Sequence, residues 1–449
     1  MSSLLYRVRI PNLELLNLEL WNLELGTRNS QLRRPIVPSY LMKRSGSADL
    51  PLHGGHVPGW LSERMATLGL AITEAIVMEY GNTEVLRRLS DPFWFQSFGA
   101  VLGMDWHSSG ITTSVMGALK RAINPHSKEL GIYICGGKGK YSRQTPAELL
   151  KVGERTGLDA NHLVHCSKLS AKVDNTAVQD GFQLYLHNFI LSDTGEWTVV
   201  QQGMREDTGT ARRYHWHSLS FNSFVEDPHT GICGTNQGEI LNLVAHEAIP
   251  SQNGILQITS QNPDRMVNEI QQLIMPHHHD VRSKDIDLRR LGSMLWLAHD
   301  SDIKSFEELL MLEGLGPRTL QSLALVSEVV HGTASRFKDP ARFSFAHGGK
   351  DGHPFPVPTK VYDETIETLR TAIDKAKLGN TDKQQAIKAL TNVAQRAEEN
   401  FIPTDNVQEF IKNERQDSWK YGGKTVFGDS QKPADLSKQR KKGVQLRLF

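Results

Sequence analysis

The spacing of apolar residues along the chain separates an α/β part from a mostly helical part. Between Trp60 and Tyr80 apolar residues recur at helical spacing, and two β-rich runs in residues 181–204 flank the turn Asp193-Thr194-Gly195, which predicts a β-hairpin. Helical spacing returns further on, over residues 262–274, 286–298, 304–331, 360–378 and 382–400. The pattern therefore predicts an α+β protein, with a mixed α/β domain over residues 42–235 and a mostly helical part over residues 236–416.

Both ends of the chain depart from this pattern. Residues 1–41 repeat Asn-Leu-Glu-Leu at a period of five, from Asn12, Asn17 and Asn22, and five matches neither the strand nor the helix period. We expect translation to begin at Met42, with a short helical extension as the alternative, and we assign residues 1–41 no function. Residues 417–449 are poor in apolar residues and predict a flexible basic tether.

Composition narrows the class of protein. The chain has 449 residues, 39% of them hydrophobic, and a net charge of +1, so any binding to nucleic acid must come from local basic patches. Three widely spaced cysteines predict neither a disulfide scaffold nor a zinc ribbon. No apolar run is long enough to span a bilayer. We expect a cytoplasmic protein without a membrane partner and, if it binds DNA, one associated with the nucleoid.

Residues 304–331 have the layout of a helix-hairpin-helix DNA-binding motif. Gly314 and Gly316 permit a tight turn, and Pro317, Arg318 and Thr319 open the second helix. Backbone N–H groups and the helix dipole at that point favour a phosphate oxygen, and Arg318 adds a charge-assisted contact. Such contacts position DNA without reading its sequence. The alternative is an ordinary αα-hairpin that ends at a glycine.

Histidines and aspartates in the α/β part suggest a metal-dependent site. We take Asp49, His53, Asp105 and His107 as candidate catalytic residues, and His187, His215 and His217 as candidate ligands of Mg²⁺ or Mn²⁺. His215 and His217 are two residues apart, so on a strand both would point to one face, and His187 on the hairpin could join them. The alternative is that these histidines are hydrogen-bonded structural residues.

Two Gly-Gly-Lys segments are expected to be loops that expose backbone donors beside cations. CGGKGKYSR supplies Lys138, Lys140 and Arg143, and AHGGKDGHP supplies Lys350. Neither has the spacing of a P-loop, so we expect contact with a DNA backbone and no nucleotide hydrolysis. Two ordinary turns are the alternative.

With these segments assembled, the sequence resembles the prokaryotic family catalogued as domain of unknown function 763. The strings KRSGSADLPLHGGHVPGWL, DWHSSGITTSVMGALK, CGGKGKYSRQTP, RRYHWHS and FSFAHGGKDGHPFPV carry the resemblance, which extends from about residue 42 to about residue 416. It implies a helix-hairpin-helix segment and brings no catalytic residues with it.

Three functions remain open at this point. The first is a metal-dependent nuclease acting on branched, nicked or single-stranded DNA, and the second is a non-enzymatic DNA-binding accessory factor of replication or repair. The third is a monofunctional DNA glycosylase, with Asp339 as the nearest candidate acid. DNA glycosylases with this hairpin carry a lysine where Arg318 stands, and an arginine cannot lose its proton to become a Schiff-base nucleophile.

The last five residues resemble the peptide that binds the bacterial sliding clamp, whose pattern is Gln-Leu-x-Leu-Phe. Gln445, Leu446, Leu448 and Phe449 match this pattern, and Arg447 departs from the small or acidic residue usual at the middle position. A short apolar peptide on a flexible tether is a common form of recognition segment. We therefore expect the bacterial sliding clamp as a partner, with a frayed terminus as the alternative.

Overall fold

The computed structural model describes residues 50–51, 57–104, 109–271, 288–333, 335, 337–341, 359–399, 424–425 and 428–429. The chain divides into residues 1–43 and residues 44–449, and all described residues belong to the second unit. The predicted sites at Asp49, His53, Asp105, His107, Lys350 and residues 445–449 lie outside the described residues.

An antiparallel sheet with the strand order β1-β6-β5-β4-β2 lies at the centre of the α/β part, and β7 also pairs with β6. Its strands are β1 (Leu50–Pro51), β2 (Ile132–Lys138), β4 (Gln183–Ser192), β5 (Trp197–Arg205), β6 (Thr210–His217) and β7 (Gly231–Cys233). The predicted hairpin is confirmed, because β4 and β5 pair in register from Leu191 opposite Trp197, and Gly195 in the turn has a φ of 91°. Two small pairs, β3 (Val178–Gln179) with β8 (Leu241–Asn242) and β9 (Lys424–Thr425) with β10 (Gly428–Asp429), complete an α+β fold.

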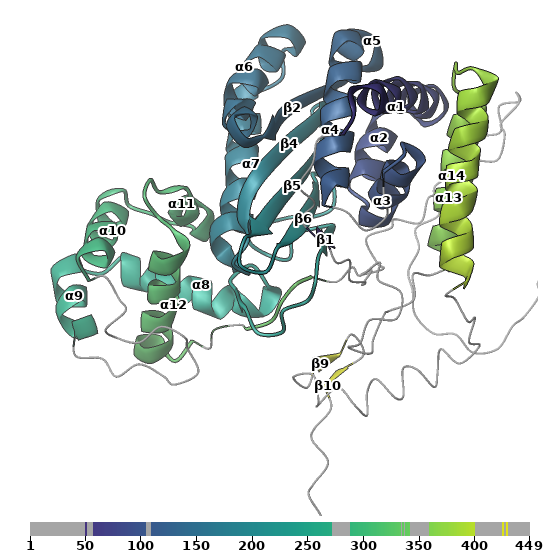
Figure 1. Cartoon of the computed structure of the whole chain (residues 1–449). Helices are drawn as coiled ribbons and strands as arrows, with labels where there is room; N and C mark the ends of the chain where they lie inside the picture. The colour runs from purple at the N-terminus through teal and green to yellow at the C-terminus, as the bar shows by residue number, and fades with distance from the viewer. Residues whose placement is uncertain are drawn as a thin grey trace, which may run out of the picture. The chain divides into compact units, whose positions relative to one another are not determined.

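Helices cover both faces of this sheet (Figure 1). On one face lie α2 (Asn82–Leu89), α3 (Pro92–Val101) and α4 (Gly110–Ile123), with α1 (Gly59–Tyr80) packed on α2 and α4. On the other face lie α6 (Thr145–Thr156) and α7 (Ala160–Lys172). The short α5 (Ser127–Leu130) precedes β2. Below, these are called the α4 face and the α7 face.

Alternation along the strands divides the apolar side chains between two cores. Phe189, Val199 and Trp216 enter the core on the α7 face, whereas Ile190 and Val200 enter the core on the α4 face. Successive side chains of a strand point to opposite faces, and here both faces are covered, so each strand reads as an almost continuous buried run.

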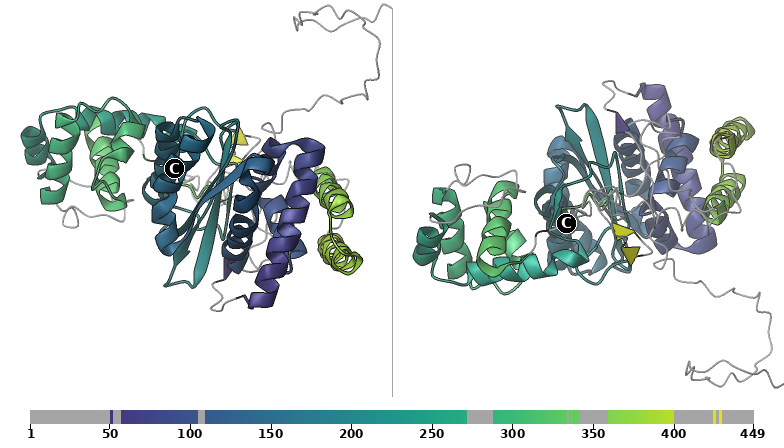
Figure 2. Two further views of the ribbon diagram at one scale, coloured as in Figure 1. Left: turned by 90° about the horizontal axis from the view of Figure 1, so that it is seen from above. Right: turned by 90° about the horizontal axis from the view of Figure 1, so that it is seen from below.

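The helical part shares these two cores. Its helices are α8 (Ile249–Thr259), α9 (Pro263–Gln271), α10 (Leu288–Asp300), α11 (Phe306–Met311), α12 (Pro317–His331), α13 (Thr359–Lys375) and α14 (Asn380–Glu399). Leu309, Leu320 and Leu323 belong to the core of the α7 face, and the predicted boundary near residue 235 therefore does not separate two cores. Helices α13 and α14 pack against α1 and α3, and both views in Figure 2 draw them beside α1. Among the described residues, no helix is long and apolar enough to cross a membrane.

Candidate nucleic-acid interface

The helices expected in residues 304–331 are α11 and α12, joined by a turn over residues 312–316. Ser305 begins α11, and its Oγ accepts a hydrogen bond from the backbone N–H of Glu308 at 3.1 Å. Gly314 has a φ of 83°, which favours glycine, and the next side chain, Leu315, is buried in the core. Gly316 is extended and lies at the N-cap of α12, with Pro317 in the first helical position.

The first turn of α12 is open to an anion. Gly316 provides no side chain to cap the first N–H groups, and Arg318 is exposed beside them. The turn's carbonyl oxygens already have donors: Arg290 Nη2 donates to Gly314 O at 3.3 Å, and Lys172 Nζ donates to Leu315 O at 3.1 Å. Three cations therefore lie around a group of N–H donors, and Glu313 is the nearby exposed acid.

The three candidate metal ligands do not share one face of the sheet. His187 on β4 lies opposite Gln201 on β5, whereas His215 and His217 on β6 lie opposite Val200 and Thr198. His215 and His217 do point to one face, the α4 face, as the spacing predicts. His187 points to the α7 face, and the prediction that it could join the other two is wrong. The reason is that Gln201 and Val200 are neighbours in β5, so their cross-strand partners point in opposite directions.

Hydrogen bonds occupy the rings of these histidines. His215 Nδ1 lies 2.9 Å from Leu89 O, and its Nε2 accepts from Arg213 Nε at 2.8 Å. His187 bridges Ser167 Oγ at 2.8 Å and Gln201 Oε1 at 2.7 Å. Burial lowers the pKa of His187 and His217, and lowers that of His215 well below its ordinary value. Across the described ranges, no group of three or more His, Cys, Asp or Glu residues has an arrangement that could hold a metal ion.

The Gly136-Gly137-Lys138 segment is a strand, and the expectation of a loop with exposed backbone donors is wrong there. These residues form the end of β2 and pair with β4, Gly136 opposite Asn188. The N–H of Gly136 donates to Glu148 Oε2 at 2.7 Å, and its carbonyl accepts from Lys120 Nζ at 2.7 Å. The basic side chains are nevertheless exposed: Lys138 ends β2, and Lys140 and Arg143 lie in the following 3-10 segment, η3 (Gly139–Gln144).

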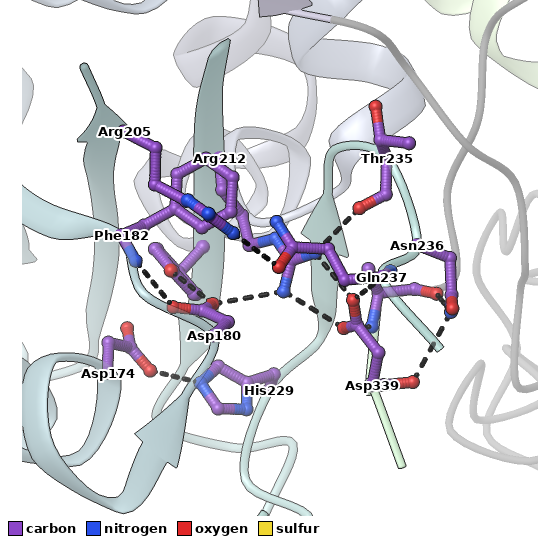
Figure 3. Close-up of polar contacts among 12 residues, drawn as sticks. Asp174, Asp180, Phe182, Arg205, Arg212, His229, Thr235, Asn236, Gln237 and Asp339 are labelled. Atoms are coloured by element: carbon purple, nitrogen blue, oxygen red, sulfur yellow. Dashed lines mark hydrogen bonds and ion pairs between the residues drawn. The ribbon is translucent and has the colours of Figure 1, made fainter. Parts of the chain in front are cut away.

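A buried ion-pair network lies on the α7 face (Figure 3). Arg212 donates to Asp180 Oδ2 at 3.0 Å and to both oxygens of Asp339, at 2.9 and 2.6 Å. Burial raises the pKa of Asp180 to about 6, against the opposing effects of Arg212 and the Tyr214 hydroxyl. Burial acts to lower the pKa of Arg212, but the two carboxylates outweigh it and raise that pKa.

Asp339 is therefore fully engaged within the protein. Besides Arg212, the backbone N–H groups of Gln237 and Ala341 donate to its oxygens at 2.7 and 2.9 Å, and its side chain is buried. A glycosylase acid must face the base or sugar that it acts on. The arrangement disfavours Asp339 in that role.

A second buried carboxylate, Asp174, lies on the same face. It accepts hydrogen bonds from Trp216 Nε1 at 3.0 Å, from Gln201 Nε2 and from His229 Nε2. His229 and Asp174 are drawn at the edge of the network in Figure 3. Through Gln201, Asp174 connects to His187, which explains why His187 is held inside the core.

An acidic pocket of about 620 Å³ opens beside Asp180. Its lining includes four carboxylates and one cation, namely Asp180, Glu206, Asp207, Glu239 and Arg205, and it reaches Gln321 on α12. Arg205 is already paired with Asp207 at 2.7 Å. This charge balance repels phosphate, so the pocket does not extend the basic surface of the hairpin.

Comparison with protein families gives one match. Residues 46–357 match the model of the family described as "Protein of unknown function (DUF763)". The chain belongs to the DUF763 family. The matched region contains every candidate catalytic, metal and DNA-binding residue, and it ends before α13 and the predicted clamp-binding peptide. No curated protein and no solved structure matches the chain.

The described neighbours of the two predicted catalytic segments lie at one end of the sheet. Leu50 in β1 pairs with Ala211 in β6, and Gln202 in β5 donates to Ser109 O at 3.1 Å. Gln202 pairs with Arg213, two residues from Ala211 along β6. Leu50 and Ser109, which border these segments in the sequence, thus contact the neighbouring strands β6 and β5.

Two tyrosines at this end of the sheet were not predicted from the sequence to be functional residues. Tyr141 stands within KGKYSR, between the predicted DNA-binding cations, and is half exposed. Tyr185 lies at a β-bulge between Leu184 and Leu186, where the register of β4 and β5 shifts. The alternation of basic and aromatic residues was the available signal for Tyr141. No local pattern marks Tyr185, because its orientation depends on pairing with β5.

Proposed function

We propose that this protein binds the sugar-phosphate backbone of DNA at the N-terminus of α12. The observation that carries the proposal is the combination of an uncapped first turn at Gly316 with Arg318, Arg290 and Lys172 around it. Backbone N–H groups and the helix dipole favour a phosphate oxygen, and the cations add charge-assisted contacts. Binding of this kind is independent of sequence and weakens with salt.

Replacing Gly316 by aspartate should weaken DNA binding without destabilising the fold. Gly316 has an extended backbone, and an added Cβ would meet Arg290 Nη2 at 3.5 Å, an ordinary contact. An aspartate at an N-cap accepts the hydrogen bonds that a phosphate would otherwise accept, and it stabilises the helix. We expect Gly316→Asp to keep or raise the melting temperature while weakening duplex DNA binding roughly tenfold or more, since about two contacts of 1 kcal/mol are lost.

Fluorescence anisotropy with labelled duplexes of two unrelated sequences measures this effect. Gly316→Ala is the matched control, because it adds the same Cβ without a capping oxygen, and it should bind DNA within about twofold of wild type. Equal affinity of Gly316→Asp and Gly316→Ala for both duplexes would refute binding at this turn.

A metal-dependent nuclease activity is the second proposal. Support comes from the sequence, in which Asp49, His53, Asp105 and His107 all lie within the region that matches the family. Aspartate and histidine are suitable ligands for Mg²⁺ or Mn²⁺, which would activate water for attack on a phosphodiester. His187 and His215 are excluded from this role by their hydrogen bonds within the core.

Incubation of the purified protein with flap, nicked and single-stranded DNA tests this second proposal. We expect cleavage with Mg²⁺ or Mn²⁺, none with EDTA, and loss of cleavage with retained binding in Asp105→Ala and His107→Ala. Unchanged DNA across the panel, with binding intact, would leave the non-enzymatic accessory function. A product lacking a base on an intact backbone would instead support a glycosylase.

A further inference from the structure

An exposed basic and aromatic surface lies at the end of β2, an edge strand of the sheet, and shares no residue with the lining of the acidic pocket. It consists of Lys138, Lys140, Tyr141 and Arg143 from β2 and η3, together with Tyr185 from β4, and is called the β2–η3 surface below. The three cations and Tyr141 are exposed, and Tyr141 retains 50% of its accessible area. Among the described residues, no carboxylate forms an ion pair with these three cations.

Each tyrosine of this surface lies beside a lysine. Lys140 Nζ is 5.4 Å from the centre of the Tyr141 ring, and Lys138 Nζ is 5.8 Å from the centre of the Tyr185 ring. Cations at such distances are attracted by the ring face. The surface therefore places positive charge beside aromatic rings.

The backbone fixes Tyr141 in place. Gly137 has a φ of 143°, and a Cβ there would approach Tyr141 Cβ to 3.1 Å, so η3 folds closely back over the end of β2. Ser142 Oγ donates to Gly139 O at 2.6 Å, and Thr145 Oγ1 donates to Ser142 O at 2.7 Å, which holds the turn. Because the backbone that carries this exposed ring is already held, less conformational freedom is lost when a planar group stacks on the ring.

A bulge in β4 places Tyr185 beside Lys138. The register shift around Tyr185 turns its hydroxyl to Gln202 Nε2, which donates to it at 2.5 Å. Gln202 also donates to Ser109 O at the start of α4, so Tyr185 is connected to that helix through Gln202. Bulges commonly redirect a side chain in this way.

The charges of the acidic pocket and of the β2–η3 surface restrict where a DNA strand can lie. The carboxylates that line the pocket are Asp180, Glu206, Asp207 and Glu239. Glu148, the acid near β2, is occupied by Lys120 and by the N–H of Gly136. A polyanion is thus repelled at the pocket and attracted at the β2–η3 surface.

We propose that the β2–η3 surface binds an unpaired stretch of DNA, with a base stacked on Tyr141 and phosphates on Lys138, Lys140 and Arg143. A tyrosine ring stacks on the face of a base, and the bases of a duplex expose only their edges in the grooves. The surface therefore selects single-stranded DNA. This inference deepens the proposed DNA binding, and it concerns a surface separate from the turn at Gly316.

Tyr141→Ala in the full-length protein tests the proposal with a labelled oligothymidine and a duplex of equal length. One base stacked on an aromatic ring contributes enough that its loss should weaken oligothymidine binding roughly 5- to 100-fold. Duplex binding should change less than about twofold. Tyr80→Ala is the matched control, because Tyr80 is exposed to 49%, close to Tyr141, but lies at the end of α1.

Two further variants distinguish stacking from charge and from a folding defect. Tyr141→Phe keeps the ring and should restore oligothymidine binding to within about twofold of wild type. Lys140→Gln should lower the slope of log K against log salt by roughly 0.7, as expected for one lost phosphate contact to a single strand, whereas Tyr141→Ala should leave that slope unchanged.

Measuring both duplex and oligothymidine binding distinguishes failure of this inference from failure of the proposed binding at Gly316. If Gly316→Asp weakens duplex binding as expected and oligothymidine binding still depends on Tyr141, both proposals stand. If wild type binds oligothymidine through Tyr141 and binds no duplex, the hairpin proposal fails and this one stands. Oligothymidine binding that is absent, or equal in Tyr141→Ala and Tyr80→Ala, overturns the inference.

Discussion

Two adjacent arginines on β6 show that a buried positive charge has different partners on the two faces of the sheet. Arg212 points to the α7 face, where it forms ion pairs with Asp180 and Asp339. Arg213 points to the α4 face, where it donates to His215 Nε2 at 2.8 Å and to Gln96 Oε1 at 2.9 Å, with the Phe95 ring 4.6 Å away. Both side chains are fully buried.

The pKa directions follow this difference. The carboxylates raise the pKa of Arg212, whereas burial lowers that of Arg213, whose surroundings are neutral dipoles and the Cys233 thiol. Burial also raises the pKa of Cys233 to about 11, so the thiol remains neutral at physiological pH. On the α7 face, Arg212 is paired with carboxylates, whereas on the α4 face Arg213 is held by hydrogen bonds to neutral groups. Removing one partner should therefore lower the free energy of unfolding more on the α7 face than on the α4 face.

Asp339→Ala should produce the largest loss of stability. It removes the bidentate partner of Arg212 and leaves the N–H groups of Gln237 and Ala341 without an acceptor. Breaking a buried pair in this way costs about 3–5 kcal/mol. The free energy of unfolding, measured by urea titration, checks the value.

One variant on the α4 face and one at an exposed ion pair provide the comparison for Asp339→Ala. Gln96→Leu removes a hydrogen bond to the charged Arg213 and should cost about 1.5–3 kcal/mol. Asp382→Ala breaks an exposed pair with Arg64 and should cost at most about 1 kcal/mol. A larger loss in Gln96→Leu than in Asp339→Ala would contradict the contrast between the faces.

The sequence predicts the local elements of this fold better than its long-range partners. Helix α1, the β4–β5 hairpin and the helices of the 304–331 segment follow from local apolar spacing and turn residues. The partner of Arg212 is 127 residues away, and no local pattern pairs it with Asp339. Such pairing depends on strand order and on loops that only the folded chain brings together.

The histidines also show that the sequence predicts features of one strand better than the pairing between strands. The spacing of His215 and His217 correctly places both on one face, because alternation is a property of a single strand. Adding His187 requires the register between β4 and β5, and a shift of one residue reverses the face. Exposure of Tyr141 and burial of His187 likewise depend on which helices cover each edge of the sheet.

The pH dependence of stability gives a smaller and more selective test of the two faces. On the α4 face, burial lowers the pKa of His215 and His217, so the unfolded chain binds more protons than the native protein below about pH 6.5. Their contribution to stability is present above that pH and is lost as the pH falls. On the α7 face, burial raises the pKa of Asp180 from 3.8 to about 6, so the native protein binds the extra proton between these values, and this contribution to stability rises as the pH falls. His187 on the same face acts in the opposite direction, because burial lowers its pKa.

Variants should therefore change the slope of unfolding free energy against pH in opposite directions between pH 7 and pH 5. His215→Gln keeps a donor for Leu89 O and an acceptor for Arg213, and it should make the acid-side loss shallower by up to about 1.4 kcal/mol per pH unit. Asp180→Asn should make the loss steeper, because the opposing contribution disappears. His165→Gln, at an exposed position on α7, provides the control for loss of a histidine. Urea titrations at each pH measure the slopes. If His215→Gln and Asp180→Asn shift the slope in the same direction, burial does not change the pKa of these two groups in opposite directions.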